Sequence, residues 1–205
     1  MSGQERQATH FFDLPILASA PLAWEKMLMR YPSLAQAARM PADQAAFVAG
    51  YLCHLQADWM WITDIFAPVF GPWSHWQDFR QRLYLHNVLR AYLDRQILEG
   101  LPEHTGSDLG RALPKAWLPF VEDRHLYHWR DFLADQLLPG ATVQTVEVFA
   151  ARQGVPAETY YLLLNSEERM EQEIFIHLPR QSLLSYRQRL LVANGHLLQA
   201  YLLGV

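Results

Sequence analysis

The chain has 205 residues, of which 51% are hydrophobic and 19% are charged, so it is long and apolar enough to bury a substantial core. Its formal net charge is −4 and its basic residues are scattered, which excludes the clustered Lys and Arg of a nucleic-acid-binding surface. The single cysteine, Cys53, excludes an intrachain disulfide and a cysteine-rich zinc site.

The N-terminal residues, Met1 to Gln7, are polar and lack the basic start and apolar run of a secretory signal. The most apolar stretch, residues 45–70, contains polar side chains that are expensive in lipid, so we expect no transmembrane helix. We therefore expect a cytoplasmic protein, and the sequence leaves a homo-oligomer open.

Apolar periodicity, prolines and glycines predict a series of helices. Pro21 falls near the first turn of the first expected helix, 21–31. Pro68 and Gly71 are expected to end the third helix, 41–66, and Gly100 follows the fourth, 74–99. Thr142 is placed to cap the sixth. The expected ranges are 21–31, 33–40, 41–66, 74–99, 122–138, 142–154, 157–178 and 180–203.

Residues 101–119 form a loop-rich connection with room for one short helix, which is either a functional lid or a simple crossover. No alternating strand pattern is long enough to insist on a sheet. The sequence therefore predicts an all-α fold, in which residues 1–205 form a single-domain bundle of about six to eight helices around a buried central helix.

The central helix, residues 41–66, carries the best candidate for chemistry. It is apolar almost all round, so we expect burial on most of its faces. His54 and Asp58 are four residues apart and lie one turn apart on one face. They could ligate one cation, or they could form a structural hydrogen-bonded pair. If the pair is buried, Asp58→Ala should cost about 1–3 kcal/mol, because His54 would lose its partner.

Other constellations are weaker. The chain contains no GxSxG serine elbow and no glycine-rich phosphate loop. Glu122 and His125 supply only one of the two Glu-x-x-His motifs that a dimetal bundle needs, and Glu173 with His177 fits a surface contact. The roles of three histidines stay open: His86, which lies in an apolar series, His125 and His128.

Two motifs occur in order along the chain: Thr9-His10-Phe11, and Gly50-Tyr51-Leu52-Cys53-His54-Leu55-Gln56-Ala57-Asp58. Together they resemble the zinc-dependent phospholipase C family, which shows a Thr-His-Phe segment and then a GYxxHxxxD helix. The resemblance covers about residues 6–70, roughly a third of the chain. It implies an all-α fold, zinc held by His and Asp side chains on several helices, and hydrolysis of phospholipid phosphodiester bonds.

Carried over to this chain, the resemblance implies that His10, His54 and Asp58 are zinc ligands. Asp13 and Asp64 are candidate catalytic residues, as additional ligands or as bases that orient water. The family commonly has a His at the position of Asp64, which on a straight helix points about 120° away from Asp58. The later HxxxE pair of the family has no clear counterpart here.

The resemblance also implies a helix with an early His, followed by a Pro-Asp segment, ahead of the Thr-His-Phe motif. The sequence begins nine residues before His10, so either that helix has been lost or Met1 is an internal methionine. With fewer ligands than the family, this 205-residue form is expected to bind at most one divalent ion firmly and to show weak or absent phosphodiesterase activity.

Three functional hypotheses follow. The first is a metal-dependent hydrolase that acts on phosphodiesters, with a small-molecule or phospholipid-like substrate. The second is a non-enzymatic helical protein that retains a degenerate form of the fold and binds a partner or a small ligand. The third is a small-ligand-binding bundle with a tryptophan-rich cleft near Trp59, Trp61, Trp73 and Trp76. The first predicts that the His10 side chain approaches those of His54 and Asp58.

Overall fold

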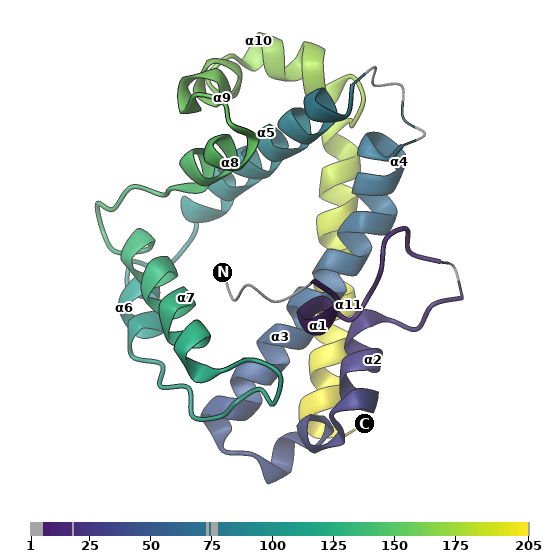
Figure 1. Cartoon of the computed structure of the whole chain (residues 1–205), viewed down its shortest axis with the longest axis vertical. Helices are drawn as coiled ribbons and strands as arrows, with labels where there is room; N and C mark the ends of the chain where they lie inside the picture. The colour runs from purple at the N-terminus through teal and green to yellow at the C-terminus, as the bar shows by residue number, and fades with distance from the viewer. Residues whose placement is uncertain (1–5, 18, 73, 75–77, 205) are drawn as a thin grey trace. The chain divides into compact units, whose positions relative to one another are not determined.

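The computed structural model describes residues 6–17, 19–72, 74 and 78–204. These residues contain no strand, and seven of their α-helices have seven or more residues. The expected all-α fold is therefore confirmed (Figure 1).

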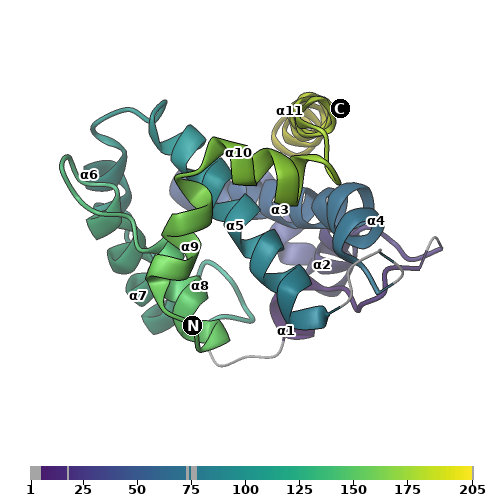
Figure 2. The same cartoon turned by 90° about the horizontal axis from the view of Figure 1, so that it is seen from above.

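The helical elements follow one another with few long interruptions (Figures 1 and 2). Short 3₁₀ or π-helical segments carry the label η. In chain order the elements are α1 (Arg6–His10), α2 (Ala23–Arg30), η1 (Pro32–Ala35), η2 (Ala37–Arg39), α3 (Ala42–Trp61), η3 (Ile62–Phe66), α4 (Ala67–Phe70), α5 (Phe79–Leu98), α6 (Thr105–Gly110), α7 (Asp123–Gln136), α8 (Thr145–Gln153), α9 (Ala157–Leu164), α10 (Glu167–Met170), η4 (Glu171–Phe175) and α11 (Arg180–Leu203).

The chain forms two compact units, and each unit is assembled from segments that are separated in sequence. Unit 1 consists of Met1–Asp64, Arg111–Asp131 and Ser185–Val205, and unit 2 of Ile65–Gly110 and Phe132–Leu184. The single domain expected from the sequence stays a prediction.

Helix α3 forms the buried centre of unit 1. Its residues Val48, Leu52 and Leu55 are fully buried, at the spacing of one helical face. They share a core with Met27 of α2 and with Leu197 of α11. This confirms a buried central helix. Burial on most faces is also found, since the exposed positions from Phe47 to Trp61 are confined to the one face that carries Gly50 and His54.

Polar contacts fix the C-terminal helix against α3 within unit 1. The side-chain amide of Gln56 donates to Oδ1 of Asn194 at 2.9 Å, and the Tyr186 hydroxyl donates to the Ala57 carbonyl at 3.1 Å. Gln56 is almost completely buried, so its amide needs such a partner. These bonds set the register of α11 along α3 and leave the His54 side of α3 uncovered by this helix.

Helical structure continues past the expected end near residue 66 and stops at Phe70, directly before Gly71, one of the residues expected to end it. A π-helical turn, η3, follows α3, and α4 then continues to Phe70 with Pro68 in its first turn. A proline is tolerated there because the first turn of a helix does not use its N–H groups in the helical ladder.

Two further expectations about helix ends are corrected, and a third is refined. Helix α8 begins at Thr145 after the cap Gln144, so Thr142 is not its N-cap. The expected helix 157–178 is divided near Ser166, whose hydroxyl accepts from the Arg169 backbone N–H at 3.3 Å and caps α10. The expected helical piece 33–40 is found as two 3₁₀ turns, η1 and η2, interrupted at Gln36. At Ser166 a local side-chain bond outweighs the apolar periodicity.

Unit 2 is built around α5, which packs against α8 and α9. His86 on α5 is buried between the rings of Phe66 and Phe70, with ring centroids at 4.9 and 5.2 Å. Burial, with a smaller effect of the Arg90 charge, lowers the pKa of His86 to about 3. The sequence left its role open, and the structure shows a neutral core histidine.

None of the helices in the described part of the chain combines the length and the hydropathy that a bilayer crossing requires.

Candidate metal centre

His10 is the last residue of α1, a helix of five residues that docks on α3 within unit 1. A helix this short has little stability of its own, so its position depends on tertiary contacts. The Tyr51 hydroxyl on α3 provides one, because it donates to the Thr9 carbonyl at 2.6 Å. Burial, and to a smaller extent the Asp58 charge, raises the pKa of Tyr51, which keeps its hydroxyl protonated as a donor.

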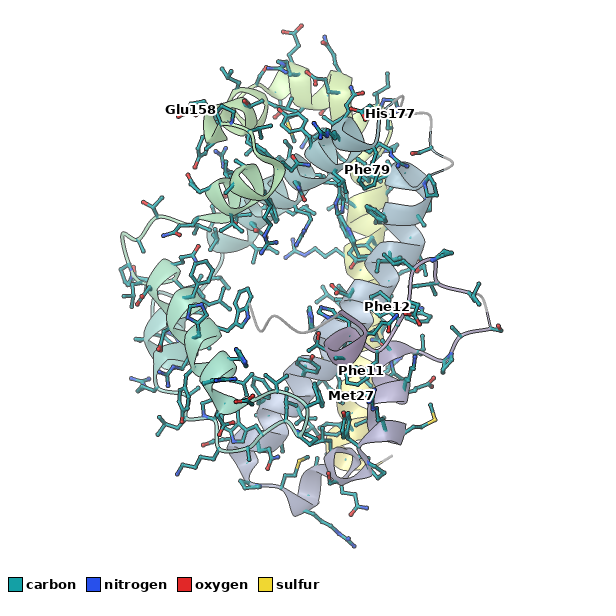
Figure 3. The ribbon with its side chains drawn as sticks, in the orientation of Figure 1. Phe11, Phe12, Met27, Phe79, Glu158 and His177 are labelled. Atoms are coloured by element: carbon teal, nitrogen blue, oxygen red, sulfur yellow. The ribbon has the colours of Figure 1, made fainter. Side chains whose placement is uncertain are left out.

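The chain turns sharply after His10. Phe11 has a φ of 62°, in the left-handed region that bulky residues rarely adopt at a cost on the order of 1–3 kcal/mol. Its side chain is only 2% exposed and meets the Phe120 ring edge-on at a centroid distance of 5.0 Å. Phe12 and Met27, also buried, lie nearby (Figure 3). The burial of this aromatic group offsets the backbone strain and holds His10 at the surface of α3.

His54 and Asp58 lie one turn apart on the open face of α3. His54 is exposed, and the side chains of Asp58 and His10 are 32% and 29% exposed. The sequence-based premise of a buried His54–Asp58 pair is therefore wrong. The apolar composition of the helix concealed this, because the uncovered face carries only a few polar residues among small and apolar ones.

The structure brings these three residues together, as the sequence predicted. One candidate ligand atom each of His10, His54 and Asp58 lies within 4.8 Å of the other two. Nε2 of His10 is 3.6 Å from Oδ2 of Asp58, and the His10 and His54 rings meet edge-on with centroids 5.4 Å apart. Among the residues that the structure describes, no other group of three His, Cys, Asp or Glu side chains meets this condition.

The second ring nitrogen of His10 also has a neighbour. Nδ1 lies 2.9 Å from the Thr9 hydroxyl oxygen, within hydrogen-bonding distance. When Nδ1 carries the imidazole proton and donates it to Thr9, Nε2 is the unprotonated nitrogen, which is the form that binds a cation. The Thr9 hydroxyl is compatible with this ring form, because a hydroxyl oxygen can accept as well as donate.

The donor set fits a divalent transition-metal ion. Two imidazoles and one carboxylate are a ligand combination of catalytic zinc sites, which keep a fourth position for water. Tetrahedral ligands at zinc–ligand distances of about 2.0–2.2 Å are about 3.3–3.6 Å apart, close to the 3.6 Å between His10 and Asp58. The wider spacing of the group, up to 4.8 Å, can be closed by small rotations of these solvent-facing side chains.

Asp13 and Asp64, the expected catalytic residues, are not members of this group of three. Asp64 lies in η3, where Oδ2 accepts from the Arg189 guanidinium at 2.8 Å and Oδ1 accepts from the Thr63 hydroxyl at 3.0 Å. Asp13 is exposed and accepts from the Gln7 side chain. Their catalytic roles stay predictions.

The remaining sequence candidates lie elsewhere. Trp61 packs edge-on against Tyr186 with centroids 5.4 Å apart, Trp59 lines a small pocket, and Trp73 and Trp76 lie outside the described residues. Glu173 accepts from the Arg169 guanidinium at 2.8 Å. His125 is half-buried and His128 is exposed, and neither belongs to the group of three.

Sequence reasoning named no role for Thr9 and Tyr51, although both belong to the motifs that carry His10 and His54. The signal available in the sequence was their position in the two motifs. Thr9 directly precedes His10, and Tyr51 lies about one helical turn before His54. What could not be seen in the sequence is that Tyr51 bonds to Thr9 and so joins the two motifs.

Comparison of the chain with models of protein families, with curated proteins and with solved structures finds no match. The resemblance to the zinc-dependent phospholipase C family stays a prediction.

Proposed function

We propose that this protein is a metal-dependent hydrolase in which His10, His54 and Asp58 bind one divalent cation, with zinc as the first candidate. The observation that carries the proposal is the meeting of three ligand side chains from two helices that are distant in sequence. Imidazole nitrogen and carboxylate oxygen together suit zinc better than calcium or magnesium, which prefer oxygen alone.

Exposure of the site favours catalysis over a structural role. Structural zinc sites are closed by four protein ligands, whereas catalytic sites keep an open position for water or substrate. His54 is exposed and the other two side chains are about one-third exposed, so a substrate can reach them. A cation held there lowers the pKa of a bound water and stabilises the negative charge that develops during hydrolysis.

Phosphodiesters are the substrate class that the motif resemblance supports. Within that class, a centre with three protein ligands holds one ion, and a single ion provides less charge than a metal cluster. We therefore expect slow turnover. Asp13 and Asp64 remain candidate bases, a small-molecule or phospholipid-like substrate remains the expected partner, and the cytoplasmic location stays a prediction.

The test is hydrolysis of a chromogenic phosphodiester and of phosphatidylcholine with added zinc, by the wild type and by His54→Ala. Turnover that chelation and His54→Ala both abolish supports the proposal. Turnover that His54→Ala leaves unchanged would assign the activity to another site or to a contaminant. No turnover in a zinc-loaded protein would contradict hydrolysis and favour the alternative, a non-enzymatic helical protein that binds a partner or a small ligand.

A further inference from the structure

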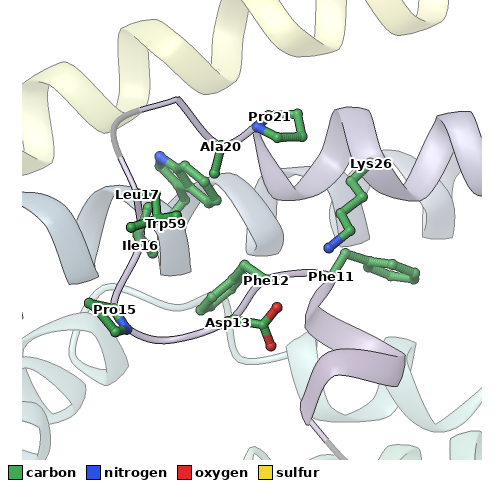
Figure 4. A pocket seen from close by; sticks show the side chains of 10 residues that line it. All are labelled: Phe11, Phe12, Asp13, Pro15, Ile16, Leu17, Ala20, Pro21, Lys26 and Trp59. Carbon is green, nitrogen blue, oxygen red and sulfur yellow. The ribbon is translucent and has the colours of Figure 1, made fainter.

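A small pocket lies beside the candidate metal centre, within unit 1. It has a volume of about 130 Å³, and most of its lining is apolar (Figure 4). Phe12 and Trp59 form one side, and the segment after the Thr-His-Phe motif, including Ile16, Leu17 and Ala20, forms much of the rest. Two charged residues, Asp13 and Lys26, also line it.

The pocket and the three ligands share a wall. The Phe12 ring meets the Trp59 ring edge-on at a centroid distance of 5.9 Å, and it meets the His10 ring edge-on at 6.3 Å. Trp59 directly follows Asp58 on α3, and Phe12 is two residues after His10. One aromatic ring therefore borders both the ligand group and the pocket, and none of His10, His54 and Asp58 lines the pocket itself.

The size of the pocket restricts its occupant. Cavities of about 150 Å³ with apolar walls bind benzene, whereas sites for larger organic ligands measure about 300–1,000 Å³. A volume of about 130 Å³ holds one aromatic ring or a short branched alkyl group, and a long acyl chain would extend out of it. Aromatic walls such as Phe12 and Trp59 favour a ring, through edge-to-face contact.

We infer that this pocket binds a compact apolar substituent, the size of a phenyl ring, on a ligand whose phosphoryl group reaches the metal centre. This inference rests on the proposed function and narrows its substrate class. The preferred substrates are phosphodiesters with one small apolar group rather than lipids recognised by their acyl chains. Lys26 and Asp13 bring one positive and one negative charge to the pocket, so selection of an anionic ligand falls to the metal centre rather than to the pocket.

The test uses two probes that separate the pocket from the metal. Fluorobenzene, followed by ¹⁹F NMR with metal-free protein, reports the pocket alone. The affinities of zinc-loaded protein for phenylphosphonate and methylphosphonate, measured by calorimetry, report whether the two sites act together. Ala20→Leu fills the pocket, and Ala46→Leu, at an exposed position of α3, is the matched control.

We expect fluorobenzene to bind the wild type, Ala46→Leu and His54→Ala, and not Ala20→Leu. We expect phenylphosphonate to bind zinc-loaded wild type about tenfold more tightly than methylphosphonate, and Ala20→Leu to remove that preference while the affinity for methylphosphonate is kept. Absence of fluorobenzene binding, or binding that Ala20→Leu does not change, would overturn the proposal that the pocket binds an apolar substituent. This holds whether or not the protein binds zinc. Fluorobenzene binding without zinc binding would instead overturn the proposed function, and with it the assignment of the pocket to a substrate.

Discussion

The Tyr51 hydroxyl donates a 2.6 Å hydrogen bond to the Thr9 carbonyl and so ties the short helix that ends in His10 to the helix that carries His54 and Asp58. This bond joins the two sequence motifs at one point. It explains how residues far apart in the chain reach the same small volume.

Tyr51→Phe should therefore weaken both the fold and the metal site. Removing the hydroxyl leaves the Thr9 carbonyl without this donor, at a cost of about 0.5–1.5 kcal/mol in the free energy of unfolding. Because α1 is then held less firmly, zinc affinity should also fall. Tyr127→Phe is the matched control, since that hydroxyl donates to the Pro114 carbonyl at 2.8 Å in the same unit. It should lose similar stability and keep its zinc affinity; equal losses of affinity in both variants would contradict a local role for Tyr51.

Thr9→Val should lower zinc affinity about 10–100-fold with little change in stability, because it removes the oxygen beside Nδ1 of His10 while keeping the side-chain shape. Zinc titration and chemical denaturation measure the two quantities. Thr9→Ser restores the hydroxyl and should recover most of the affinity. Unchanged zinc affinity in Thr9→Val would contradict a role for the Thr9 oxygen, and failure of Thr9→Ser to recover the affinity would show that the Thr9 methyl group is needed as well.

Asp58→Ala and Asp64→Asn should affect zinc binding differently and so distinguish the roles of the two carboxylates. Asp58 is about one-third exposed, so its removal should change the free energy of unfolding by less than about 1 kcal/mol, in contrast to the cost expected for a buried pair. It should nevertheless abolish tight zinc binding. Asp64→Asn should retain zinc binding, because Asp64 lies outside the ligand group and its ion pair is with Arg189. Loss of zinc from Asp64→Asn would add Asp64 to the ligand set.

The burial of neutral His86 predicts that the free energy of unfolding falls in acid. Its pKa is about 3 in the folded protein and about 6.5 when unfolded, so below pH 6.5 the unfolded state takes up a proton that the folded state does not. Stability therefore falls as the pH drops from about 6.5 towards 3, by up to about 1.4 kcal/mol per pH unit from this group. Urea denaturation of the wild type and His86→Leu between pH 8 and pH 4 isolates the effect. Parallel pH profiles for the two proteins would show that His86 is not buried as described.

Much of the fold could be predicted from the sequence where strong local signals agree. Pro179 and the apolar pattern after it placed the last helix at 180–203, where α11 is found. The π-helical turn before Pro68 and the break near Ser166 were missed, because both depend on which backbone groups are satisfied locally rather than on periodicity.

The sequence predicted which residues belong to the candidate site, but not how exposed they are or what they contact. The two motifs named His10, His54 and Asp58, and the structure places them together. Their exposure could not be predicted, because a helix with apolar residues on all sides gives no indication of which face its neighbours leave uncovered. The bond from Tyr51 to Thr9 is a tertiary contact and has no signal in either motif alone.

Zinc stoichiometry tests the central claim most directly. His104 and Asp108 on the surface of unit 2 repeat the spacing of His54 and Asp58, with Nε2 and Oδ2 3.6 Å apart, but they form no group of three with another described residue. Equilibrium dialysis with zinc of the wild type, His54→Ala and His104→Ala compares the two pairs. We predict one tightly bound zinc per chain in the wild type and in His104→Ala, and affinity weakened by more than about 100-fold in His54→Ala. Zinc bound equally by the wild type and His54→Ala, or by neither, would contradict a metal centre at His10, His54 and Asp58.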